Sequence, residues 1–132
     1  MPYMFDTNIC IYLLKRHPPE PLERLKKLRK GEALMSVVTH AELRAGLERQ
    51  TLQRAHDEQI LQLLIQRVPV LPFDLQPSIA YGRLRAAVPD RRRNALDSLI
   101  AAHAVSVNAT LVTNNQADFK DYPGLNVENW VA

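Results

Sequence analysis

The sequence predicts an α/β fold: a three-layer α/β/α sandwich with a small, mostly parallel sheet and predominant helix. Short apolar segments are bounded by polar, Gly or Pro residues, and helical patterns lie between them. This alternation is typical of βαβ units. The chain has 132 residues, of which 46% are hydrophobic, enough for one core and too few for two. We therefore expect one domain spanning residues 1–132.

The expected strands are short apolar runs, as for strands buried on both faces of a parallel sheet. They cover residues 3–5, 33–38, 70–73 and 110–113. A first helix is expected directly after Asp6. The spacing or composition predicts further helices over residues 21–30, 39–49, 52–67, 77–88 and 95–107. The basic run 26–30 is interpreted as the exposed face of its helix.

The remaining bulk features indicate an intracellular protein. Cys10 is the single cysteine, which excludes an intramolecular disulfide and suits a reducing cytosol. Asp6 and Asn8 interrupt the first apolar run, so we expect no signal peptide. The apolar stretches are far shorter than a membrane span. We expect a soluble, cytoplasmic protein without a membrane partner.

Four carboxylates occupy corresponding places in this pattern. Asp6, Glu42 and Asp118 each follow an expected strand, and Asp97 opens the helix that leads into one. Each acid has a simpler structural explanation: Asp6 as an N-cap, Glu42 as the end of a "THAE" capping box, Asp97 as the capping-box partner of Asn94, and Asp118 as a turn residue. In an open parallel sheet, however, these positions share one edge, where active sites form. We expect the four acids to lie together there.

Such a cluster predicts a site for a hard metal ion. Asp97 shares its helix face with Ile100, Ala101 and Ala104, so its carboxylate is expected to be buried and to require a partner. Crowded carboxylates resist ionisation unless a cation offsets them. Oxygen ligands suit Mg²⁺ or Mn²⁺ rather than zinc.

The rest of the molecule is basic. Without the four acids, seventeen Lys and Arg residues face ten Asp and Glu residues, a net charge of +7. This pattern fits a polyanion that docks around an acidic metal site, and predicts phosphodiester hydrolysis by metal-activated water. The candidate phosphate contacts are Arg44, Arg49, Arg91, Arg92 and Arg93; a solvated surface charge is the alternative for each.

Other catalytic arrangements find less support. The sequence has no Gly-rich phosphate loop, and its four histidines lack zinc-ligand spacing. His103 falls within an apolar helix and is interpreted as a packed core histidine. Cys10 is interpreted as a small buried hydrophobe.

Four stretches, "MFDTNICIYLL", "SVVTHAELRAGL", "ALDSLIAAHA" and "LVTNNQADF", resemble the motifs of PIN-domain proteins in order and spacing. The whole chain is similar to the VapC-type toxins of bacterial toxin–antitoxin pairs, in their enteric branch. The loop "VPDRRRNALD" departs from that branch, which often has a Gly-rich "GxPIG"-like approach to the third acid; Asp90 in this loop is interpreted as a surface charge.

The resemblance implies a PIN-like fold and a Mg²⁺- or Mn²⁺-dependent endoribonuclease. It implies that Asp6 and Asp97 hold the metal and that Glu42 and Asp118 complete the catalytic set. Asn115, acting through an outer-shell water, is the alternative to Asp118. Donors that hold the carboxylates in position are then expected at Thr7, Asn8 and Thr113.

The same resemblance implies partners. The first is an RNA substrate, and the expectation is tRNA, cut in the anticodon region of initiator tRNA. The second is a cognate VapB-type antitoxin, and operator DNA is bound only through the antitoxin complex. The last is a second copy of the chain in a homodimer. An antitoxin groove is expected along Leu13, Leu14, Leu52, Ile60 and Leu64, for which core packing is the alternative.

Two alternatives, a non-catalytic module and a DNA nuclease, stay open to test, and a phosphatase is discounted. A non-catalytic PIN-fold module would bind RNA or protein without cutting, but it would be expected to lack one of the acids. A phosphatase of the haloacid dehalogenase type needs a second Asp where this chain has Asn8. A DNA nuclease is compatible with a mechanism that does not use the 2′-hydroxyl.

Overall fold

The structure, a computed structural model, describes residues 2–50, 52–88 and 94–131. Its centre is an all-parallel sheet of five strands in the order β3-β2-β1-β4-β5. The strands are β1 (Tyr3–Phe5), β2 (Ala33–Ser36), β3 (Val70–Leu71), β4 (Thr110–Val112) and β5 (Asn126–Glu128). The register pairs Tyr3 with Ala33 on one side and with Thr110 on the other.

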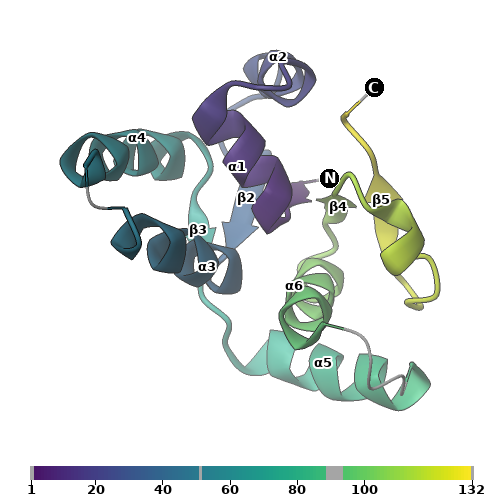
Figure 1. Ribbon diagram of the computed structural model, residues 1–132. Helices are drawn as coiled ribbons and strands as arrows, with labels where there is room; N and C mark the ends of the chain where they lie inside the picture. Colours follow the sequence, from purple (N-terminus) through teal and green to yellow (C-terminus); the bar gives the residue numbers. More distant parts are fainter. Residues whose placement is uncertain (1, 51, 89–93, 132) are drawn as a thin grey trace.

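Helices cover both faces of the sheet (Figure 1). They are α1 (Thr7–Lys15), α2 (Glu20–Lys26), α3 (Val37–Glu48), α4 (Arg54–Arg67), α5 (Leu75–Ala87), α6 (Ala95–Ser106) and the short 3₁₀ helix η1 (Gln116–Asp118). Helices α5 and α6 lie together on one side, and α1, α3 and α4 lie on the other. The expected α/β/α sandwich is confirmed, with a sheet that is entirely parallel.

Two apolar cores follow from the alternation of side chains along the strands. Phe5 and Val112 point into the core beneath α1–α4, together with Trp130. Met4 and Leu111 point into the core beneath α5 and α6. Because the inner strands β1, β2 and β4 are covered on both faces, their sequences are mostly continuous apolar runs rather than alternating ones. None of the helices in these described stretches has the length and apolar character that crossing a bilayer requires.

Several expected boundaries are wrong. The strand expected over residues 33–38 ends at Ser36, because the Ser36 hydroxyl accepts the Val38 N–H and starts α3 two residues before Thr39. The capping box expected at Thr39 and Glu42 is therefore wrong, and Thr39 lies inside the helix. The helix expected over residues 21–30 ends at Lys26. Strand β5 was not expected, because "NVE" carries no apolar run.

Candidate active site

Asp6 stands at the carboxyl end of β1, in the middle strand of the sheet. Its backbone N–H bonds Val112 O at 3.1 Å, and its carboxylate accepts the Ile9 N–H at 3.0 Å. Asp6 therefore does cap α1, as its simpler explanation predicted. Burial raises its pKa, the Thr113 side chain and the N–H groups of Ile9 and Asn8 oppose that rise, and the charge of Glu42 adds to it.

Glu42 lies in the second turn of α3 and is held from α1. The Thr7 hydroxyl donates to Glu42 Oε1 at 2.6 Å. Thr7 therefore donates to Glu42 and the Thr113 side chain bonds Asp6, as expected for residues that hold the acids in position. Asn8 contributes its backbone N–H to Asp6. Asp6 and Glu42 are near neighbours because β1 and β2 pair directly in the sheet.

Asp97 lies in the first turn of α6, whose buried face is mostly apolar but includes Ser98 and His103. The Asn94 side chain caps this helix by accepting the Leu96 N–H at 2.9 Å. Ile100, Ala101 and Ala104 are fully buried, as expected. Burial and the charges of Asp6, Glu42 and Asp118 raise the pKa of Asp97 to about 6. The four predicted acids therefore share one electrostatic site.

Asp118 ends η1, in the loop that follows β4. The Asn115 amide donates to its Oδ2, and the Asn115 N–H bonds Thr113 Oγ1 at 3.0 Å. Asp118 and Asn115, the two candidates for the fourth residue of the catalytic set, are thus hydrogen-bonded to one another. Asn115 supports Asp118 directly, so the amide and the carboxylate belong to one unit.

The donor set suits a hard, hydrated cation. All four acids offer oxygen ligands, and a cation among them would offset the repulsion and burial that raise the pKa of Asp97. Across the described residues, no three His, Cys, Asp or Glu side chains stand close enough together to enclose a metal ion. Mg²⁺ is commonly held by one or two carboxylates and keeps several waters, so it does not require three such side chains in contact with it.

A groove leads away from this site between α1, α3 and α4. Its volume is about 510 Å³, and Thr7, Asn8 and Glu42 line it beside apolar residues. Of the expected groove residues, Leu14 and Ile60 line it. Leu13 and Leu64 are buried in the core, and Leu52 is 95% exposed and lies outside the lining. The sequence did not identify Lys15, Gln50 and Asp57 in this lining, because helix periodicity does not reveal which helix faces another.

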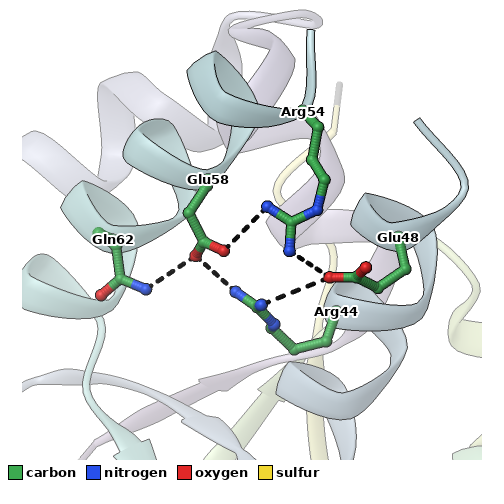
Figure 2. Close-up of polar contacts among 5 residues, drawn as sticks. All are labelled: Arg44, Glu48, Arg54, Glu58 and Gln62. Atoms are coloured by element: carbon green, nitrogen blue, oxygen red, sulfur yellow. Dashed lines mark hydrogen bonds and ion pairs between the residues drawn. The ribbon is translucent and has the colours of Figure 1, made fainter. Parts of the chain in front are cut away.

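The basic residues near the site differ in their availability. Figure 2 shows Arg44 of α3 between two carboxylates, Glu48 on its own helix and Glu58 on α4. Arg54 bridges the same two carboxylates. The Arg44 guanidinium holds the pKa of Glu58 at about 2. These ion pairs join α3 to α4, and Arg44 as a phosphate contact stays a prediction.

Arg49 lies in the lining of the groove, with no ion pair within the described part of the chain. It remains a candidate for phosphate. Residues 90–93, with the arginines expected to contact phosphate and Asp90, lie outside the described residues.

The histidine and cysteine interpretations hold. His103 is 1% exposed, and its Nδ1 lies 2.7 Å from Ser36 Oγ, so α6 is tied to the N-terminus of α3. Burial lowers the pKa of His103. Cys10 is fully buried, and burial raises its thiol pKa above the ordinary range.

Comparison with known proteins gives a consistent set of matches. The PIN domain model matches residues 3–125. Ribonuclease VapC2 of Rickettsia felis is 35% identical, with 98% of each chain covered. The tRNA(fMet)-specific endonuclease VapC of Shigella flexneri is 33% identical, with 97% of each covered. The crystal structure of VapBC2 from Rickettsia felis, bound to a DNA fragment from their promoter, superposes with a TM-score of 0.89 at 34% identity, covering 98% of this chain and 99% of that one.

Proposed function

This chain belongs to the PIN-domain family and, within it, to the VapC ribonucleases, and we propose that it is the endoribonuclease toxin of a toxin–antitoxin pair that cuts tRNA with the help of Mg²⁺ or Mn²⁺. The observation that carries the catalytic part is the electrostatic coupling of Asp97 to Asp6, Glu42 and Asp118 at one edge of the sheet. Within this proposal, residues 1–132 act as a single domain in the cytoplasm.

Each acid has a role in the proposed mechanism. Asp6 and Asp97 would hold the divalent cation, because they are the two acids whose pKa is raised by burial and whose charge most needs an offset. When bound, the cation supplies a Lewis acid that activates water for in-line attack on phosphorus and neutralises charge as the bond breaks. Glu42 and Asp118, at the margins of the site, orient the attacking water and the outer ligands. Thr7 fixes Glu42, and Asn115 fixes Asp118.

We assign the substrate as tRNA because the Shigella flexneri relative is named a tRNA(fMet)-specific endonuclease. The basic balance of the chain supports a polyanion, and Arg49 beside Glu42 in the groove is the described candidate for contact with its phosphates. The anticodon region of initiator tRNA is the first cut site to examine.

The partner is a VapB-type antitoxin, with operator DNA bound through the complex, as in the promoter-bound Rickettsia felis assembly. The groove between α1, α3 and α4 suits this partner: apolar side chains of the antitoxin would pack on Ile11, Leu14 and Ile60, and the same segment would cover Glu42. A homodimer would use α5, where Leu75 and Ile79 lie one turn apart with exposed side chains.

The test is cleavage of total tRNA, and of DNA oligonucleotides matched to the cut sites, by antitoxin-free protein in Mg²⁺, Mn²⁺ or EDTA. Discrete RNA fragments that require metal support the proposal. Equal cutting of RNA and DNA would favour the general nuclease. Binding of tRNA without cutting, by folded protein in either metal, would favour the non-catalytic module.

A further inference from the structure

We propose that Tyr122 is a positioning residue for the carboxylate site: through its bond to Ser98 it fixes the turn that carries Asp118 against the helix that carries Asp97. This inference rests on the proposed function, because it concerns how two of the four acids are held at the distance that a cation requires. It gives a role to the buried hydroxyl groups of Ser98 and Tyr122, which do not line the groove.

The Ser98 and Tyr122 hydroxyl groups share one hydrogen bond. Ser98 Oγ lies 2.8 Å from Tyr122 OH, and both residues are buried, Ser98 completely. Ser98 Oγ also donates to the Asn94 carbonyl at 3.2 Å. Either hydroxyl of the Ser98–Tyr122 pair can be the donor. Tyr122 is thereby anchored to the N-terminal turn of α6, directly beside Asp97.

The segment between Asp118 and Tyr122 transmits this anchor. The Asp118 N–H bonds Asn115 O at 3.1 Å, Phe119 N–H bonds Gln116 O at 3.1 Å, and Tyr122 N–H bonds Phe119 O at 3.2 Å. These bonds join the turn into one unit. Asp118 itself is exposed, and its position depends on the Asn115 amide that donates to its carboxylate and on the buried residues that follow it in the chain.

Packing alone does not fix this turn in one register. Phe119 and Tyr122 are buried, with their ring centroids 5.8 Å apart at 79°. Apolar burial is non-directional and tolerates small sliding of a surface turn over the helix. A hydrogen bond between two buried side chains selects one register, because sliding would break the bond that the two hydroxyls share.

The register matters because Mg²⁺ and its relatives require short, nearly ideal ligand distances. Asp97 directly precedes Ser98 in α6, and Asp118 lies in the same turn as Tyr122, so the bond joins the two segments that carry these acids. A small displacement of the turn would therefore change the separation of two carboxylates on which metal affinity depends, while α6 and the sheet stay in place.

Two variants remove the bond from opposite ends, Tyr122→Phe and Ser98→Ala, and a double variant combines them. The readout is Mn²⁺ binding to the antitoxin-free full chain, measured by the electron paramagnetic resonance of free Mn²⁺. We expect each single variant to bind Mn²⁺ roughly three- to tenfold more weakly, the range that the loss of one net hydrogen bond gives. The double variant should be no weaker than either single variant, because they remove the same bond.

Activity supplies a second readout. At low Mn²⁺ the variants should cut tRNA more slowly than the wild type, and saturating Mn²⁺ should restore the rate, since the acids themselves are intact. Tyr81→Phe is the matched control: Tyr81 lies on α5 and packs against the same apolar core, away from the four acids. It should bind Mn²⁺ like the wild type. Circular dichroism melts record the stability of every variant.

If both single variants bind Mn²⁺ with wild-type affinity, whatever their melting temperatures, the inference is overturned. The bond between Ser98 and Tyr122 would then contribute to stability alone. Additive losses in the double variant would also overturn it. If Tyr122→Phe does not fold, Ser98→Ala alone decides, since alanine favours the helix. A wild-type chain that neither binds Mn²⁺ nor cuts RNA would instead refute the proposed function, so the two failures are distinguishable.

Discussion

Replacing Asp97 by Asn should stabilise the metal-free protein at neutral pH while it removes activity. Burial and three neighbouring acids raise the pKa of Asp97 from 3.8 to about 6. If the whole shift acted on folding, it would destabilise the charged form by about 3 kcal/mol at 1.36 kcal/mol per unit. Because Asp97 is only half-buried, solvent screening reduces this, and we expect a gain of roughly 1–2 kcal/mol.

The pH dependence has a definite sign. Between about pH 4 and pH 6 the folded wild type binds more protons than its unfolded chain, so its stability falls as the pH rises through this window. The uncharged amide introduced by Asp97→Asn has no such dependence. The advantage of the variant should therefore be absent near pH 4 and complete above about pH 7.

Urea unfolding in EDTA, followed by circular dichroism for both proteins at several pH values, measures this difference. Adding Mg²⁺ at neutral pH should stabilise the wild type more than Asp97→Asn, since only the wild type retains the full carboxylate set. A stability difference that is the same at pH 4 and pH 7.5, or a variant that is less stable at pH 7.5, would refute the reasoning.

Four further substitutions test other parts of the account. Ser36→Ala removes the N-cap of α3, and thermal unfolding should show a loss of about 0.5–2 kcal/mol. Thr7→Val removes the bond that holds Glu42, and tRNA cleavage assays should show a roughly tenfold lower kcat with the fold retained; an unchanged kcat would contradict that role. Arg49→Ala should weaken tRNA binding and lower its salt dependence by about one ion without changing stability, whereas Arg44→Ala should loosen α3 from α4 and lower the melting temperature.

The sequence predicted the sheet and the acid cluster for a related reason. A strand buried on both faces is a continuous apolar run, and such runs are visible without any knowledge of tertiary contacts. Parallel strands bring their carboxyl ends to one edge, so an acid after each run could be placed from order alone. Asp6, Glu42 and Asp118 were predicted in this way, and Asp97 was predicted from its place at the start of the helix that leads into β4.

The parts that escaped prediction depend on contacts between distant segments or on competition between local signals. Val37 and Val38 are β-branched and extend the apolar run of β2, yet the Ser36 cap turns them into the start of α3. Arg44 reads as a free surface charge until α4 brings Glu58 beside it. The bond between Ser98 and Tyr122 likewise depends on how the turn after β4 lies on α6.

The most direct test of the central claim separates the two roles of Asp6, which caps α1 and faces the other acids. Asp6→Asn keeps an oxygen that can accept the Ile9 N–H and removes the charge that would hold a metal. Cleavage of tRNA in Mg²⁺ by the wild type and by Asp6→Asn should show metal-dependent fragments with the first protein and none with the second, at nearly equal stability. Equal cleavage by Asp6→Asn would contradict a carboxylate-held metal at the edge of this sheet.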